Sequence, residues 1–154
     1  MQEEWLVSFT AFGSPVGQGS KRIVPTKAGP SVIEANPNTR LWRDSMRFDA
    51  AEEMMNGELE MAHFPVAVRM LFFLVRPKSH YGTGRNKAVV KPSAPRRPAG
   101  RPDVDKLARA VLDGLTMGGA FADDSQVVDL QASKWYVTDG DAAGCVITVE
   151  VPGA

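Results

Sequence analysis

Three aspartates in two short motifs are the residues best suited to chemistry in this sequence. Asp103 and Asp105 are separated by one valine, and Asp124 follows in an Asp-Asp-Ser-Gln segment that begins at Asp123. Carboxylate oxygens are the ligands that hard cations prefer, and Mg²⁺ commonly takes one or two carboxylates together with a phosphate and water. The two motifs therefore predict a Mg²⁺ site that acts on a phosphate ester.

The first two aspartates stand at the start of the clearest predicted helix, over residues 103–115. Its apolar residues repeat at intervals of three and four: Val104, Leu107, Ala108, Val111, Leu112 and Leu115. The unpaired N–H groups and the dipole at a helix start favour ionised carboxylates. An N-cap role would explain Asp103 alone, but neither Asp105 nor the later pair. Asp124 lies just before a strand predicted over residues 126–137, and a tight turn there would return it to the helix start.

Two cations are predicted to accompany the carboxylates. On a strand, Lys134 shares one face with the apolar residues Val128, Leu130, Ala132 and Tyr136. A buried lysine needs an anionic partner, so we expect Lys134 to reach the carboxylates or a bound phosphate, unless its ammonium extends to solvent. Arg109 lies one turn after Asp105 and one turn before Asp113, so it either forms i,i+4 ion pairs or points at the phosphate.

The formal net charge is zero, yet the charges are segregated along the chain. Residues 76–101 contain eight Lys or Arg and no Asp or Glu, whereas Lys134 is the only cation from Ala110 onward. A DNA-cutting protein requires such a basic surface beside carboxylates, because phosphates must be attracted next to divalent cations. A solvated basic loop and a separate acidic surface are the alternative. The predicted DNA contacts are Lys21, Arg22, Arg76, Lys78, Arg85, Lys87, Arg96, Arg97 and Arg101.

Four further segments enter the predicted fold. Residues 5–12 alternate between apolar and polar side chains, as expected of a half-buried strand. Residues 65–75 are almost continuously apolar, which predicts a strand buried on both faces, and residues 146–151 give a last strand. A helix is predicted to start near residue 36 and to end at residues 56–57, with an apolar face made of Leu41, Trp42, Met46, Phe48, Met54 and Met55.

Residues 77–100 form, by prediction, a long basic loop, because they contain few residues able to enter a core. A loop of that length in a compact domain points to a function or to disorder. Along the chain, strands mostly follow strands, and two helices interrupt them. This order predicts a single α+β domain over residues 1–154, with a mixed or antiparallel sheet packed against two main helices.

Other chemistries and locations fit the sequence poorly. Cys145 is the only cysteine, so neither an intrachain disulfide nor a thiolate metal cage can form, which suits a reducing cytoplasm. His63 and His80 are the only histidines, and no nucleophile motif accompanies them. The acidic N-terminus is unlike a secretory signal, and the longest apolar run, residues 70–75, is too short to cross a bilayer. We therefore expect a cytoplasmic protein that does not enter membranes.

The acidic motifs together resemble a known family. The string Arg101-Pro-Asp-Val-Asp-Lys-Leu-Ala-Arg-Ala-Val-Leu-Asp-Gly-Leu-Thr116, the later Asp-Asp-Ser-Gln-Val-Val and then Lys134 are similar to the RusA-type Holliday junction resolvases, many of them phage-encoded. The likeness is close over residues 101–136 and extends loosely to the first strand and the Gly-Ser-Pro-Val-Gly-Gln-Gly-Ser-Lys-Arg segment after it. Lys106 stands where the family often has Asn, and Arg109 stands where some members have a functional Lys.

The resemblance implies a homodimer that binds four-way DNA junctions and cuts them by paired nicks in recombination and repair, supported by Mg²⁺ or Mn²⁺. It implies metal-binding catalytic roles for Asp103, Asp105 and Asp124, with Lys134 or Arg109 assisting the phosphate. If the protein is phage-encoded, its place of action is the bacterial host cytoplasm.

Two other functions stay open from the sequence. One is a metal-dependent nuclease that acts on flaps, forks or plain duplex DNA. The other is a DNA-binding or packaging accessory that does not cut, against which the intact set of carboxylates argues.

Overall fold

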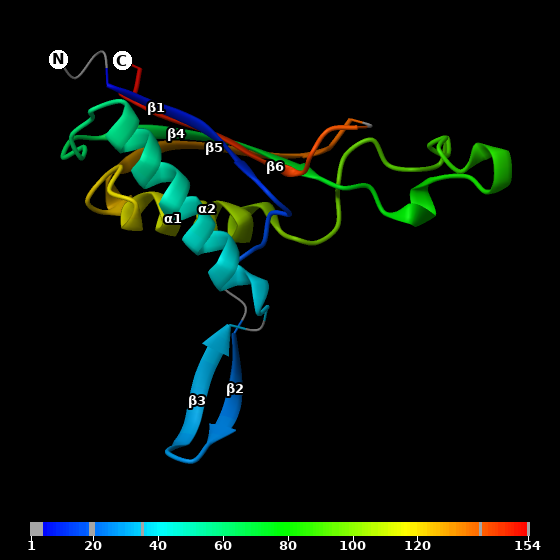
Figure 1. The fold of residues 1–154 in the computed structure, drawn as a ribbon, viewed down its shortest axis with the longest axis horizontal. Coiled ribbons are helices and arrows are strands. Elements are labelled where there is room, and N and C mark those ends of the chain that lie inside the picture. The colour runs from blue at the N-terminus through cyan, green and yellow to red at the C-terminus, as the bar shows by residue number, and fades with distance from the viewer. Residues whose placement is uncertain (1–4, 19–20, 35, 139, 154) are drawn as a thin grey trace.

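The chain folds as one mixed sheet with both helices on one of its faces and two segments that project from this body (Figure 1). The computed structural model describes residues 5–18, 21–34, 36–138 and 140–153. The strands are β1 (Leu6–Phe12), β2 (Lys21–Thr26), β3 (Gly29–Glu34), β4 (Val66–Leu74), β5 (Val127–Tyr136) and β6 (Gly144–Glu150). The helices are α1 (Asn38–Asn56) and α2 (Val104–Met117), with single 3₁₀ turns η2 (Lys78–His80), η3 (Gly84–Asn86) and η4 (Asp124–Gln126).

The four-stranded sheet has the order β1-β6-β4-β5. Strand β6 is antiparallel to both β1 and β4, whereas β4 and β5 are parallel. Parallel neighbours need a long crossover, and here residues 75–126, which include α2, supply it. The predicted α+β domain with a mixed sheet and two main helices is therefore confirmed.

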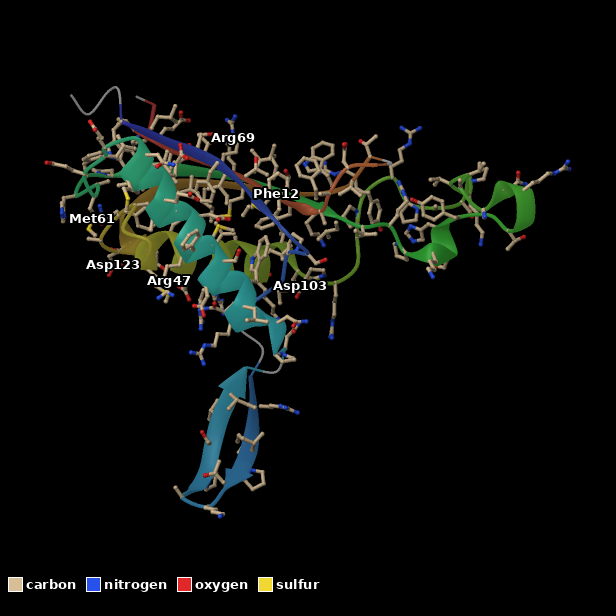
Figure 2. The ribbon with its side chains drawn as sticks, viewed as in Figure 1. Phe12, Arg47, Met61, Arg69, Asp103 and Asp123 are labelled. Atoms are coloured by element: carbon tan, nitrogen blue, oxygen red, sulfur yellow. The ribbon has the colours of Figure 1, made fainter. Side chains whose placement is uncertain are left out.

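The helices cover only one face of the sheet, so the prediction that β4 is buried on both faces was wrong. Alternate residues of β4 point into the core and are fully or almost fully buried: Val66, Val68, Met70 and Phe72. On the opposite face Arg69 is exposed (Figure 2). Leu71 and Phe73 on the same face are half-buried. A run of apolar residues cannot show by itself whether one or both faces are covered.

Helix α1 packs a narrower stripe of side chains against the core than its sequence predicted. The buried residues are Thr39, Trp42, Met46, Ala50 and Met54, which are three or four residues apart. Leu41, Phe48 and Met55 were predicted to join them, yet 68%, 66% and 77% of their surface is exposed. These three residues are seven apart, so they share a second stripe that faces away from the core.

A hairpin formed by β2 and β3 was not predicted. It projects from the body next to the start of α1 (Figure 1). Ile23 lies opposite Val32 in its register, and both are largely exposed, at 73% and 63%. The β-branched residues on both sides of Lys27-Ala28-Gly29, with Gly29 at φ +112°, are the signal from which the hairpin could have been found.

Residues 77–100, called the arm below, form the second projection (Figure 1). As predicted, the arm is a long loop, containing only η2, η3 and an isolated bridge between Tyr81 and Val90. Two arginines fasten its ends to the last residues of β5. Arg76 lies 4.2 Å over the ring of Tyr136 and donates to the Pro95 carbonyl at 2.7 Å.

Candidate active site

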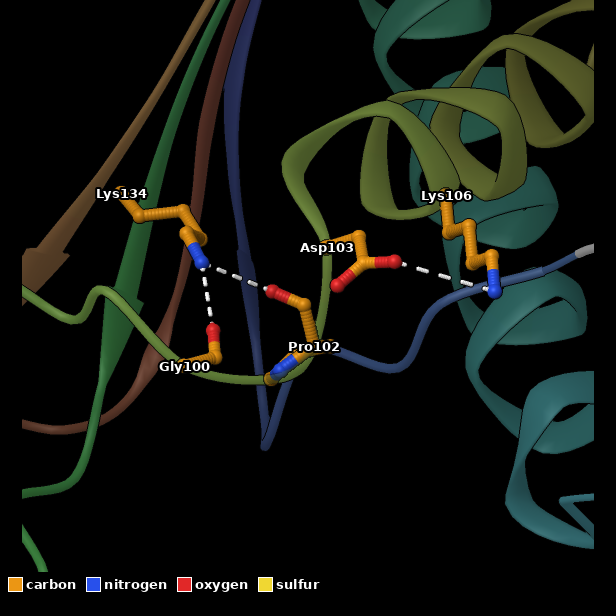
Figure 3. A network of polar contacts seen from close by, with 5 residues as sticks. All are labelled: Gly100, Pro102, Asp103, Lys106 and Lys134. Carbon is orange, nitrogen blue, oxygen red and sulfur yellow. Dashed lines mark hydrogen bonds and ion pairs between the residues drawn. The ribbon is translucent and has the colours of Figure 1, made fainter.

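The start of α2 leaves the two predicted carboxylates available. Asp103 is the N-cap residue, but its side chain makes no capping hydrogen bond. Its carboxylate instead lies 3.7 Å from the Lys106 ammonium (Figure 3). Asp105 follows in the first turn and is exposed. The N-cap alternative thus holds for the position of Asp103 and not for its side chain, and both acids can accept further ligands.

Lys134 lies on the helix-covered side of β5, as its phase predicted, but its partners differ from those expected. Its ammonium donates to the carbonyl oxygens of Gly100 at 2.7 Å and Pro102 at 2.9 Å (Figure 3). These are backbone groups of the segment that leads into α2. In the described structure Lys134 therefore binds the backbone before Asp103 rather than a carboxylate.

The two aspartates of the Asp-Asp-Ser-Gln segment differ in role. Asp123 stabilises the turn, whereas Asp124 is available to a ligand. The Asp123 carboxylate accepts a hydrogen bond from the Ser125 amide at 2.8 Å, which lowers the pKa of Asp123. The Gln126 side chain accepts from the Ala122 and Asp123 amides and donates to two further backbone carbonyls, so it anchors the turn. Asp124 is exposed and is not the residue that caps this turn, so it is the member of the pair that is available to a ligand.

Asp124 lies close enough to Asp113, in the later part of α2, for the two carboxylate charges to interact. Partial desolvation, then the neighbouring Asp123, then the charge of Asp113 raise the pKa of Asp124. Asp113 is eight residues beyond Asp105, which corresponds to about 12 Å along a helix. Figure 2 likewise shows Asp103 and Asp123 well apart. The turn is short, and the anchoring of Gln126 fixes where it can meet the helix.

The candidate acids lie in two places along α2: Asp103 and Asp105 at its start, and Asp124 near Asp113 further along. Within the described ranges no three Asp, Glu, His or Cys side chains converge closely enough to hold a metal ion. The oxygen donors are chemically suited to Mg²⁺. Their arrangement in the free protein is not a closed metal cage.

A polar network joins the glycine-containing loop after β1 to both helices, and sequence reasoning missed it. The Gln18 amide donates to the Lys106 carbonyl at 2.9 Å, and its side chain donates to the Asp113 carboxylate. Arg43 of α1 donates to the Gln18 side-chain oxygen at 3.3 Å. Gly17 permits this approach, because a Cβ there would lie 3.1 Å from Lys106 Cβ. Gly17 was the available sequence signal.

Arg109 is exposed between the two acidic groups. In the part of the chain that the structure describes, no ion pair joins Arg109 to Asp105 or Asp113. The alternative in which Arg109 is locked by i,i+4 pairs is therefore not what the structure has. Its guanidinium is open to an anion outside the protein.

A cleft of about 570 Å³ opens between the start of α1, the start of α2 and the loop after β1. Arg101, Asp103 and Lys106 contribute its charged side chains. Two helix starts and two cations make this cleft favourable for a phosphate, and Asp103 places a carboxylate beside that position.

The predicted DNA contacts fall into two kinds. Arg97 and Arg76 have internal partners: Arg97 lies 3.7 Å over the ring of Trp135 and donates to the Lys134 carbonyl at 2.9 Å. The side chain of Lys21 lies outside the described parts. The remaining predicted contacts are exposed: Arg22, Lys78, Arg85, Lys87, Arg96 and Arg101. These six stay available to a polyanion.

None of the helices described here is long and apolar enough to pass through a membrane.

The chain is similar to known proteins over most or part of its length. A Bacillus subtilis protein, uncharacterized protein YqaN, is 28% identical over 134 residues, which cover 84% of this chain and 87% of that protein. Crossover junction endodeoxyribonuclease RusA of Escherichia coli K12 is 44% identical over 48 residues, 31% of this chain and 40% of that enzyme. The RusA enzyme of Enterobacteria phage 82 matches to the same extent. A profile of endodeoxyribonuclease RusA matches residues 13–150, and the chain therefore belongs to the RusA family of endodeoxyribonucleases.

Proposed function

We propose that this protein is a Mg²⁺-dependent endonuclease that resolves four-way DNA junctions by paired nicks during recombination and repair. The observation that carries the proposal is the family match across residues 13–150, within which both acidic motifs fall. Nucleases of this family are metal-dependent. Fold alone would not support a function, but available carboxylates beside exposed cations agree with it.

The carboxylates of Asp103, Asp105 and Asp124 are the proposed metal ligands. Mg²⁺, when bound, supplies positive charge that stabilises the scissile phosphate during displacement. Because no three acids among the described residues converge as closely as a metal cage requires, we assign them the role of ligands and no further step. The surrounding cations attract and orient the phosphate: Arg101 and Lys106 line the cleft, and Arg109 is exposed three residues beyond Lys106 on α2.

The two projections are the proposed DNA-contacting surfaces. Among the predicted DNA contacts, Lys78, Arg85, Lys87 and Arg96 are exposed on the arm, and Arg22 is exposed on the hairpin. Contacts of cations with phosphates supply affinity without reading sequence, which suits a substrate recognised by shape. Arg76 and Arg97 take part indirectly, because their stacking on Tyr136 and Trp135 holds the arm to the body.

Paired nicks require two active sites, and we propose that α1 joins two copies of the chain. Its exposed stripe of Leu41, Phe48 and Met55 has the seven-residue spacing of a helix-pairing seam. An antiparallel pair centred on Phe48 would set Leu41 of one copy against Met55 of the other. The apolar stripe is then self-complementary, as a two-fold interface requires.

Cleavage of a synthetic four-way junction tests the function. Asp103→Asn, Asp105→Asn and Asp124→Asn should each lose cleavage with Mg²⁺ while binding the junction as well as or better than the unaltered protein, because removing negative charge does not weaken phosphate attraction. Asp129→Asn, which removes an exposed aspartate on β5, is the matched control and should cut normally. Normal cleavage by the first three variants would refute the assignment.

The same assay separates the alternative functions. A flap and a linear duplex of the same sequence are offered beside the junction. Preferential cutting of the junction supports the proposal, and preferential cutting of the flap or duplex identifies a different nuclease. Binding without cleavage, with any divalent ion, identifies a DNA-binding accessory.

A further inference from the structure

Lys134 lies where the arm returns to the body of the protein. It is opposite Phe72 in the parallel register of β4 and β5, and Phe72 is fully buried beneath the helices. A charged group on this covered side needs polar partners to offset its loss of hydration. The Lys134 ammonium has two such partners, the backbone carbonyls of Gly100 and Pro102.

Those two carbonyls belong to the backbone segment that leads into α2. They lie on either side of Arg101 and immediately precede Asp103 (Figure 3). The Asp103 carboxylate itself is directed toward Lys106. Lys134 therefore fixes the backbone that carries Asp103 and leaves its carboxylate to other partners.

The backbone of residue 134 holds the same segment from its other end. The Lys134 carbonyl accepts a hydrogen bond from Arg97 Nε at 2.9 Å, and the Arg97 guanidinium stacks on Trp135. Residues 97–102 are thus tied to β5 at both ends. This segment has no strand or helix of its own, so these bonds, together with the burial of Pro98, hold it in place.

We propose that Lys134 is a positioning residue for the cleavage reaction: it sets Asp103 at the cleft through Gly100 and Pro102 and does not contact DNA. The inference rests on the proposed function. It predicts that loss of the ammonium slows cutting far more than it weakens junction binding, because a misplaced catalytic group is costly whereas the cationic surface remains.

Three variants test the inference. Lys134→Met removes the N–H donors at similar length, Lys134→Arg keeps several donors, and Lys87→Met removes one exposed positive charge from the arm. Junction affinity is measured without divalent ions, and the cutting rate is measured in single turnover at saturating protein with Mg²⁺. Exchange of the Leu107 amide, which donates to the Asp103 carbonyl at 3.0 Å, is followed by NMR.

Lys134→Met should slow cutting by roughly tenfold or more with little change in affinity, and should speed exchange at Leu107. Lys134→Arg should recover most of the rate, whereas Lys87→Met should act chiefly on affinity. A Lys134→Met protein that loses affinity and rate equally, or that cuts at the normal rate, overturns the inference. If that variant does not fold, a folded Lys134→Arg protein as slow as the aspartate variants overturns it.

The amide measurement also distinguishes failure of the two proposals. An unaltered protein that cuts no junction contradicts the proposed function alone. Unchanged exchange at Leu107 in Lys134→Met contradicts the positioning role, whatever the protein cuts.

Discussion

Gly114→Ala is a sharp test of how closely α1 and α2 approach. A Cβ at residue 114 would lie 2.5 Å from Met46 Cγ, 2.8 Å from Met46 Cβ and 3.4 Å from the Arg43 carbonyl oxygen. Carbon atoms in contact are normally about 3.5–4 Å apart. The Met46 Cγ can move by a rotamer change, but its Cβ moves only with the backbone. Alanine at this position therefore requires α1 to shift.

The expected net effect follows from two opposing contributions. Overpacking of a well-packed core costs about 1–3 kcal/mol. Replacing glycine by alanine inside a helix recovers up to about 1 kcal/mol. Because the added Cβ would meet Met46 below 3 Å, the overpacking cost falls in the upper part of its range, about 2–3 kcal/mol. The variant should therefore be less stable by about 1–2 kcal/mol, which for a domain of this size lowers Tm by roughly 2–8 °C.

Thermal and urea unfolding measure the effect, with Ser45→Ala as the control. Ser45 is exposed on α1, so alanine there gains helix propensity without a clash. Combining Gly114→Ala with Met46→Ala should give a smaller loss than the sum of the two single losses, because the Cγ contact is gone. A Gly114→Ala protein as stable as the unaltered one would refute the close approach of the helices.

Three further outcomes are expected. Phe48→Glu should convert a dimer into a monomer by sedimentation, and dimers that persist would exclude the stripe on α1. Asp124→Asn should raise Tm at pH 7 in EDTA. The pKa of Asp124 in the folded protein is raised above 3.8, so ionisation of this carboxyl destabilises the fold as the pH rises from 3.8 through the folded pKa, and asparagine removes that loss. The gain should vanish below the ordinary value of 3.8, and a gain that persists in acid would contradict the stated cause. Burial raises the pKa of the Cys145 thiol, so a disulfide reagent should modify it only as fast as the protein unfolds.

Local patterns allowed most elements to be predicted from the sequence. The helix predicted over residues 103–115 is α2, and the strand predicted over residues 126–137 is β5, each within two residues at either end. Periodicity of apolar side chains reports one buried face, and glycine marks the ends. Pairing between distant segments produces no local pattern in the sequence. The parallel pairing of β4 with β5 and the open face of β4 therefore could not be predicted.

The candidate site was predictable in its residue types and less so in its geometry. Phase placed Lys134 on the covered face, but a lysine's need for a partner can be met by carbonyls as well as by carboxylates. The position of Asp124 depends on Gln126, whose side chain binds the backbone of residues 62 and 64. That contact spans over sixty residues of sequence and could not be inferred from the local motif.

The arm is inserted into the crossover between two parallel strands, and this placement has an evolutionary consequence. Parallel strands finish at the same edge of a sheet, so the arm leaves from β4 and is fastened to β5 at one shared border. Each doubling of a flexible connection costs only about 0.6 kcal/mol in closure entropy. During evolution the arm can therefore change in length or in charge while the positions of the carboxylates are kept.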